Sequence, residues 1–234
     1  NAITPRTRVI SFTHLTNTVG DLFPARELCR LARERGIISV IDGAQSFGLI
    51  DVDLSDIQPD FFTGSAHKWP CGPKETGVLF VNTSVQDRFW PSMYSSQTGN
   101  VGLSRTHEGM GQRDEPAIRS FGVEMRFLQQ IGQDVIEARS RELTDALIDG
   151  LGSIDGVTIW TSSDPTLRLA VCSFRPGHLE SSKVVQALEA DGIVAASRGD
   201  GNLGGIRFSP HFYNTFEDID RAVSSIRRYM STGL

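Results

Sequence analysis

The stretch GIISVIDGAQ, residues 36–45, decides the fold class. Gly36 is placed to end a preceding helix, and residues 37–41 form an almost continuous apolar run, which is typical of a strand covered on both faces. Asp42 follows at the carboxyl end of that strand, where open α/β sheets bind their ligands. The stretch therefore predicts a central parallel strand that carries an acidic side chain at the ligand-binding edge of a sheet.

Strand and helix patterns alternate on both sides of this stretch. Strands are predicted at residues 8–12, 61–64 and 77–81, and a helix over residues 24–35, where Pro24 suits the first turn. Such alternation is typical of a doubly wound sheet. We therefore expect an α/β fold with a mainly parallel sheet and helices on both faces.

The later part of the chain has a different rhythm. Residues 92–114 show little periodicity and are predicted to be irregular, and a helical pattern over 117–151 is broken near Gly132. We place the domain boundary at this break, so that residues 1–131 form a large domain and residues 132–234 a small α+β domain. Its predicted elements are strands at 157–160, 167–174 and 205–208 and helices at 180–190 and 216–230.

Composition excludes several classes of function. The 234 residues are 22% charged with a formal net charge of -5 and no basic stripe, so no nucleic-acid surface is expected. No apolar run approaches the roughly 20 residues that span a bilayer, so no membrane partner is expected. The three cysteines, Cys29, Cys71 and Cys172, lack metal-ligand spacing, which predicts no metal site and a cytoplasmic location. Because the chain opens without Met and a strand follows within a few residues, we expect it to begin inside a domain.

Asp42 and Lys68 are the residues whose chemistry is most informative. Asp42 could simply cap a turn, or its carboxylate could hold the protonated ring nitrogen of a cofactor. Lys68 could be an ordinary surface lysine. However, it follows the buried-looking segment 61–65 and precedes a loop with Pro70, Gly72 and Pro73. A lysine held rigidly and kept from water suits imine chemistry.

These residues lie in motifs that resemble those of a known family. The motifs HLTN (14–17), DGAQ (42–45) and SAHK (65–68) occur in the order found in class V aminotransferases, which are pyridoxal 5'-phosphate (PLP) enzymes of fold type I. The resemblance continues at GQRD (111–114) and RFSPHFYNT (207–215). That family includes cysteine desulfurases, selenocysteine lyases, isopenicillin-N-epimerase-like proteins and sulfoxide C–S lyases. Each tetrapeptide is weak alone, whereas their order along nearly the whole chain is specific.

The resemblance implies a role for each matched residue. Lys68 would be the catalytic Schiff-base lysine that also moves the α-proton of the substrate. Asp42 would pair with the pyridine nitrogen, and Gln45 would bond the phenolic oxygen. Ser65 and His67 would bind the phosphate.

Four further residues are matched with less direct roles. Asn17 would lie near the cofactor oxygen and the substrate carboxylate. Gln112 would reach the phosphate in a neighbouring subunit, which implies a homodimer with active sites near the interface. Arg207 would grip the substrate carboxylate through its planar fork, unless it is a surface arginine on an edge strand. Arg198 would be a second anion contact or part of a solvated turn.

Several histidines and an arginine are weaker candidates. His107 and Arg113 could line the mouth of an active site, with no preference over a role elsewhere. His14 and His211 are expected to be packing residues. His178 is expected to lie in a loop.

Two departures from the family pattern limit the expected activity. In desulfurases the loop that corresponds to residues 199–206 carries a nucleophilic cysteine, and here it contains none. Transfer of sulfur as a persulfide is therefore disfavoured. Elimination, including C–S cleavage, and epimerisation are favoured, with transamination as the alternative. The family's front segment, which supplies the phosphate loop and the ring-stacking residue, is also absent from residues 1–8.

A different class of function is also open, because the chain could be a non-catalytic scaffold subunit of this family. Joint retention of Asp42, Gln45, His67, Lys68 and Arg207 argues against it, since a scaffold has no use for that set. A nicotinamide-binding domain is set aside because no glycine fingerprint follows a strand.

Overall fold

The computed structural model describes residues 2–93, 102–109, 111–199 and 201–234. The chain divides into two compact units. The first contains Asn1–Thr13, Pro24–Gly48 and Val52–Gln130. The second contains His14–Phe23, Leu49–Asp51 and Ile131–Leu234.

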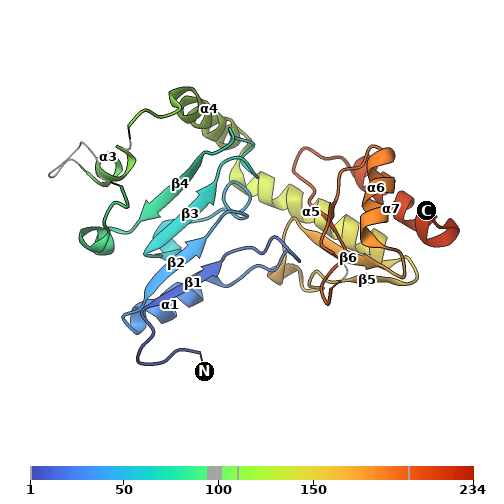
Figure 1. Cartoon of the computed structure of the whole chain (residues 1–234), viewed down its shortest axis with the longest axis horizontal. Helices are drawn as coiled ribbons and strands as arrows, with labels where there is room; N and C mark the ends of the chain where they lie inside the picture. The colour runs from blue at the N-terminus through green and yellow to red at the C-terminus, as the bar shows by residue number, and fades with distance from the viewer. Residues whose placement is uncertain (1, 94–101, 110, 200) are drawn as a thin grey trace. The chain divides into compact units, whose positions relative to one another are not determined.

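The first unit is built on a sheet with strand order β1-β2-β3-β4 (Figure 1). Its strands are β1 (Val9–Thr13), β2 (Ile38–Asp42), β3 (Phe61–Ser65) and β4 (Gly77–Val81). The pairs β1–β2 and β2–β3 are parallel, and β4 runs antiparallel to β3. The predicted, mainly parallel sheet is thus confirmed, with strand bounds within about two residues of those expected.

Helix α1 (Ala25–Glu34) connects β1 to β2 and covers the sheet. Its residues Ala25 and Cys29 pack with Ile41 and Phe62 in one buried cluster, as the apolar spacing along the helix requires. Gly36 has φ +64, the left-handed conformation that ends a helix without a Cβ penalty. The helix therefore begins and ends where Pro24 and Gly36 predict.

Short helical elements in the first unit were not predicted. They are α2 (Leu54–Ile57), the 3-10 helix η1 (Thr83–Arg88) and α3 (Leu103–Glu108). Helix α2 is only one turn long, and the Asp53 side chain accepts hydrogen bonds from the backbone N–H groups of Ser55 and Asp56 at its start. Such short elements depend on capping and show no periodicity. Helix α3 also corrects the expectation that residues 92–114 are irregular throughout.

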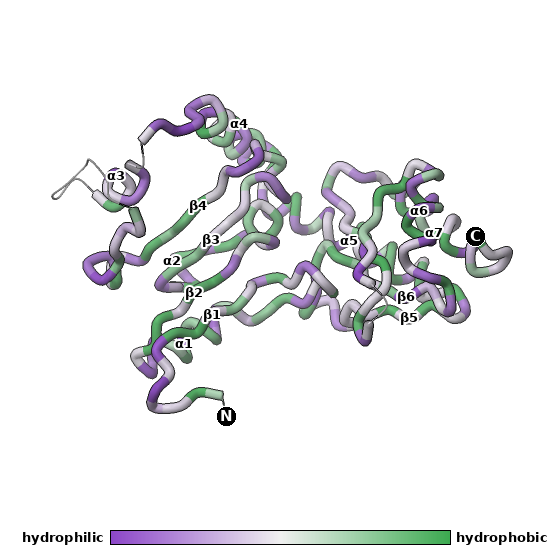
Figure 2. The backbone as a smooth tube through the Cα atoms, viewed as in Figure 1, coloured by the Kyte–Doolittle hydropathy of each residue, from purple (hydrophilic) through white to green (hydrophobic). Residues whose placement is uncertain are grey.

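The long helical pattern consists of α4 (Glu115–Ile131) and α5 (Gln133–Gly152). Gly132 lies between them with φ +98, which confirms the predicted break. Figure 2 shows short apolar segments separated by polar ones along the chain. Among the described residues, no helix is long and apolar enough to cross a bilayer.

The second unit contains an antiparallel sheet with strand order β5-β6-β8-β7. Its strands are β5 (Val157–Ile159), β6 (Cys172–Pro176), β7 (Ala196–Ser197) and β8 (Ile206–Phe208). Helices α5, α6 (Ser181–Ala190) and α7 (Phe216–Thr232) bury Leu143, Leu188 and Ile226 in a common core with Phe174 of β6. The predicted α+β pattern of this region is confirmed. Helix α7 begins at a capping box between Thr215 and Asp218.

One strand of the second unit lies later than predicted. Residues 167–174 were expected to be a strand, but Pro165–Leu167 forms a 3-10 turn and β6 begins at Cys172. Ala170 has φ +53, which is incompatible with a strand. Leu169 and Val171 are nevertheless buried, so the apolar character of residues 169–171 reflects their burial and not a strand conformation. The two-residue strand β7 was also missed.

Segment His14–Phe23 packs in the second unit, which the sequence did not predict. Backbone hydrogen bonds join Leu22 N to Leu167 O and Leu169 N to Gly20 O. Gly20 has φ +80, and a Cβ there would lie 2.8 Å from the Val171 carbonyl oxygen. The glycine thus permits a close approach that holds this segment, including Asn17, against residues 167–173.

Candidate functional site

Asp42 is the last residue of β2 and is exposed at the carboxyl edge of the parallel strands. It is in register with Thr13 of β1 and Thr63 of β3. One carboxylate oxygen, Oδ1, accepts the backbone N–H of Ala44 at 2.9 Å. Within the part of the chain that the structure describes, Asp42 makes no further side-chain hydrogen bond or ion pair. The turn-capping role therefore uses one oxygen and leaves Oδ2 available to a cationic ligand.

Gln45 is joined to the loop that carries Lys68. The indole Nε1–H of Trp69 donates to Oε1 of Gln45 at 3.1 Å. Trp69 is only 6% exposed, so the link is shielded from solvent on one side. Sequence reasoning missed Trp69, although an indole directly after the motif lysine and a glutamine shortly after the motif aspartate were the available signals.

A second contact joins the same two segments. Gly48 has φ +77, and a Cβ there would lie 2.5 Å from Cγ of Pro70. Only glycine fits both the backbone conformation and the space. The turn after Asp42 and the loop after Lys68 are therefore packed together at Gly48–Pro70 as well as at Gln45–Trp69.

The lysine loop is also held by its own backbone. Cys71 N donates to the Lys68 carbonyl at 3.0 Å, and Gly72 N donates to the Ala66 carbonyl at 2.7 Å. Cys71 has φ +61, a conformation that a non-glycine residue adopts only when its surroundings impose it. The lysine loop is thus closed by two backbone hydrogen bonds, and its rigidity remains a prediction.

Exposure of the loop side chains differs from expectation. Lys68 was expected to be kept from water, but Lys68 and its neighbour His67 are both exposed in this chain. Ser65 ends β3 and is half-buried. The phosphate-binding roles of Ser65 and His67 remain predictions. Gln112 is exposed, just before α4, and its role toward a neighbouring subunit also remains a prediction.

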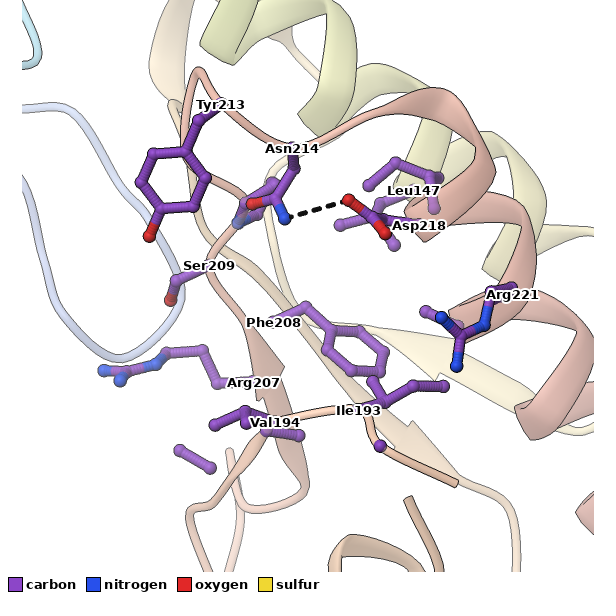
Figure 3. A pocket seen from close by; sticks show the side chains of 16 residues that line it. Leu147, Ile193, Val194, Arg207, Phe208, Ser209, Tyr213, Asn214, Asp218 and Arg221 are labelled. Carbon is purple, nitrogen blue, oxygen red and sulfur yellow. Dashed lines mark hydrogen bonds between the residues drawn. The ribbon is translucent and has the colours of Figure 1, made fainter. Parts of the chain in front are cut away.

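Arg207 belongs to the second unit and lies on β8, between β6 and β7 in the sheet. This position excludes the alternative of an arginine on an edge strand. Its neighbours Ile206 and Phe208 are buried in the core, so strand alternation turns Arg207 to the opposite face. Figure 3 shows its guanidinium extending away from Phe208, at the rim of a cavity of about 480 Å³.

Two guanidinium groups converge on the backbone carbonyl of Asn17. Arg207 Nη1 donates to this oxygen at 2.7 Å and Arg198 Nη2 at 3.1 Å. Ser173 is in register with Arg207 on β6, and its Oγ donates to the next carbonyl, that of Thr18. Two positive charges at one place favour an anionic ligand, and a carboxylate matches the fork of an arginine. The structure brings Asn17, Arg198 and Arg207 together, and Ser173 is the member that sequence reasoning missed.

Arg207 retains binding capacity beyond this contact. Its Nε is buried and has no hydrogen-bond acceptor among the described residues. A buried donor without an acceptor is costly unless a ligand or water satisfies it. A ligand with an acceptor atom beside β8 would satisfy this donor.

The weaker candidates have structural roles. The His107 ring stacks on Phe89 with a centroid separation of 4.5 Å, and Arg113 pairs with Glu108 at 2.6 Å. His14 and His211 are both buried, as expected of packing residues. Burial, opposed by the nearby Glu137 carboxylate, lowers the pKa of His14 from 6.5 to about 4.

None of the three thiols is activated. Burial raises the pKa of Cys29, and it raises the pKa of Cys172 to about 12. Cys71 is exposed, but partial burial of its sulfur and the Glu124 carboxylate raise its pKa as well. A nucleophilic thiolate requires a lowered pKa, so none of these cysteines has the electrostatic environment of a sulfur acceptor.

The fold and these side chains give an α/β protein with a candidate ligand site at the carboxyl edge of a parallel sheet, and an arginine pair in a separate α+β unit. The chain belongs to the aminotransferase class-V family, whose model matches residues 1–222.

Comparison with known proteins gives a relative in sequence and several neighbours in fold. The chain is 32% identical to isopenicillin N epimerase of Streptomyces clavuligerus over 242 residues, 96% of this chain and 61% of that protein. Its fold is similar to cysteine desulfurase from Thermococcus onnurineus NA1, with a TM-score of 0.88, 24% identity, and coverage of 97% of this chain and 60% of that one.

The fold is also similar to that of C-DES, a cystine C–S lyase. It has TM-scores of 0.85 and 0.84 in two structures, at 21% and 20% identity, with 96% of this chain and 62% and 61% of those chains covered. One structure contains cysteine persulfide, and the other, of a mutant, contains glycine covalently linked to the PLP cofactor. This chain spans about three fifths of the length of each of these relatives.

Proposed function

We propose that this chain forms part of a PLP-dependent enzyme that acts on an amino acid. The observation that carries the proposal is the joined pair of motif segments, in which Gln45–Trp69 and Gly48–Pro70 place the Asp42 turn against the Lys68 loop. Family membership and the PLP cofactor of C-DES support it.

The residues present fit the cofactor. Asp42 has a carboxylate oxygen left for a protonated pyridine nitrogen. Gln45 has an amide nitrogen left for the phenolic oxygen, because Trp69 already uses its amide oxygen. Lys68 is exposed on a loop that backbone hydrogen bonds close, so its amine is accessible to a ligand. When bound, PLP supplies an electrophilic aldehyde and a ring that withdraws electrons from the substrate's Cα.

Each of the matched residues would have one role toward the cofactor or the substrate. Asp42 would hold the proton on the ring nitrogen. Lys68 Nζ would take the proton from Cα of the substrate, and that proton would go to the leaving group in an elimination, whereas an epimerisation would end with reprotonation of Cα. Arg207 and Asn17 bind the substrate carboxylate, and Arg198 adds positive charge beside them. Ser65, His67 and Gln112 serve the phosphate.

Among PLP reactions we favour elimination, including C–S cleavage, or epimerisation. Both need proton transfer at Cα and no protein thiol. Segment 199–206 carries no cysteine, and the pKa values of Cys29, Cys71 and Cys172 are raised. The similarity to an epimerase and to a C–S lyase supports this choice. Transamination is the alternative. We also propose a homodimer and a cytoplasmic location.

Spectroscopy of the full-length protein separates an enzyme from a scaffold. Added PLP should produce an absorbance band at roughly 400–430 nm that borohydride removes and that Lys68→Ala lacks. Absence of the band in the wild type would reject the proposal of a PLP enzyme and favour a non-catalytic scaffold subunit.

A product screen then identifies the reaction. Cysteine, cysteine sulfoxides and alanine are supplied separately, and pyruvate, sulfide and racemisation are measured. Pyruvate from cysteine or its sulfoxides indicates elimination, pyruvate from alanine indicates transamination, and loss of optical activity indicates epimerisation. Sulfide together with alanine would contradict the choice, because it requires a sulfur acceptor.

A further inference from the structure

The Trp69–Gln45 hydrogen bond fixes which end of the Gln45 amide is presented to a ligand. An indole N–H can only donate, so its partner must be the amide oxygen and not the amide nitrogen. The bond length of 3.1 Å lies within the normal range for N–H···O. Gln45 Nε2 consequently faces the other direction as a donor, and it has no acceptor within the described residues.

Trp69 is placed rigidly enough to impose this orientation. Trp69 is 6% exposed, and the next residue, Pro70, is buried and packs on Gly48. Backbone hydrogen bonds at Lys68–Cys71 and Ala66–Gly72 close the loop on either side. A partly exposed glutamine without such a partner can rotate its amide and present either an acceptor or a donor.

We propose that Trp69 is a positioning residue, which holds Gln45 Nε2 as a donor toward the phenolic oxygen of bound PLP. Because Trp69 directly follows Lys68, the same hydrogen bond ties the backbone of the lysine to the residue that contacts the ring. This assignment rests on the proposed function.

The test uses Trp69→Phe in the full-length protein, which keeps an aromatic ring and removes the N–H donor. Gln45 then loses its fixed orientation, and the donor reaches the phenolic oxygen only part of the time. We expect the dissociation constant for PLP to rise about threefold to tenfold, the effect of one hydrogen bond. The pH midpoint of the PLP absorbance band should rise by roughly half a unit, because an oxygen that loses a donor holds its proton more tightly.

Trp90→Phe is the matched control, since Trp90 is 81% exposed and belongs to neither motif. It should leave both the dissociation constant and the midpoint unchanged. Circular dichroism and the unfolding midpoint establish whether Trp69→Phe folds. If it does not fold, the indole proton of Trp69 is followed by NMR in the cofactor-free protein. Gln45→Leu should then shift that proton and speed its exchange with solvent.

A double-mutant cycle separates positioning from general packing. Gln45→Leu alone should weaken PLP binding, and Trp69→Phe should add less than about twofold in that background, because it acts through Gln45. Full additivity would overturn the assignment, as would an unchanged dissociation constant and midpoint in Trp69→Phe. The assignment would also be overturned if Gln45→Leu changed neither the chemical shift nor the solvent exchange rate of the Trp69 indole proton. Absence of PLP binding in the wild type would instead reject the proposed function.

Discussion

The guanidinium of Arg207 and the backbone carbonyl of Asn17 are joined by a hydrogen bond of 2.7 Å, although 190 positions separate the two residues. The bond uses Nη1 of Arg207, and Arg198 donates to the same oxygen. An arginine anchored at one nitrogen keeps a fixed plane, which suits two-point binding of a carboxylate.

We therefore predict that Arg207→Lys weakens amino-acid binding. A lysine preserves the charge but provides neither the fork nor the anchored plane. The KM should rise about tenfold to a hundredfold, the effect of a charged hydrogen-bond pair, with a much smaller change in kcat. Steady-state kinetics check this, with exposed Arg6→Lys as the control. Equal KM values in wild type and Arg207→Lys would show that Arg207 does not bind the substrate carboxylate.

Gly48→Ala tests the packing of the Asp42 turn against the lysine loop. The new Cβ meets Pro70 at 2.5 Å on a backbone with φ +77, so we expect a loss of about 2–4 kcal/mol in the free energy of unfolding. Gly36→Ala is the matched control, because Gly36 has φ +64 but a Cβ added there would have nothing within 4 Å. It should lose only about 1 kcal/mol. Urea unfolding of both variants isolates the steric part, and equal losses would show that Pro70 simply moves aside.

His14 predicts a pH dependence of stability. Its pKa is lowered from 6.5 to about 4 in the folded state, chiefly by burial. Between these values the unfolded chain binds more protons, so the free energy of unfolding falls as the pH falls from 6.5 toward 4. The loss reaches roughly 3 kcal/mol at most.

Urea unfolding at several pH values checks the His14 prediction. In His14→Gln the slope over this window should flatten, whatever the variant's stability at pH 7. His178→Gln, at an exposed position, should retain the wild-type slope. A wild-type slope in His14→Gln would mean that other groups bind these protons.

The cysteines should prove dispensable for catalysis. Cys71 is exposed, but its raised pKa leaves little thiolate at pH 7, so iodoacetamide should label it no faster than a free cysteine. Cys71→Ser should keep at least about half of the wild-type kcat. A persulfide trapped on Cys71 during turnover, together with loss of activity in Cys71→Ser, would contradict this prediction and indicate that the enzyme transfers sulfur through Cys71.

The sequence predicted those parts of the structure that depend on local pattern. Apolar runs and the residues at their ends located β1–β4 and α1, and Gly132 marked the break between α4 and α5. Strand bounds were predicted less well where buried residues do not adopt strand geometry. Ala170 has a positive φ, so β6 begins only at Cys172.

The candidate site shows the same division. Motif order predicted Asp42, Gln45, Lys68 and Arg207 as site residues, because the chemistry of each suits one role at a PLP site. The links that position them could not be predicted, since Trp69–Gln45 and Arg207–Asn17 join residues that are 24 and 190 positions apart. Contacts between residues so far apart in the sequence depend on how the chain packs and not on the periodicity of the sequence.

Borohydride reduction of the full-length, PLP-supplemented protein, followed by peptide mass spectrometry, tests the central claim most directly. Reduction fixes the cofactor to whichever amine holds it. We predict one phosphopyridoxyl group per chain, carried by Lys68 in the segment SAHKWP, residues 65–70, and no such modification of Lys74 or Lys183. A label on another lysine, or no label at all, would contradict Lys68 as the cofactor-binding residue.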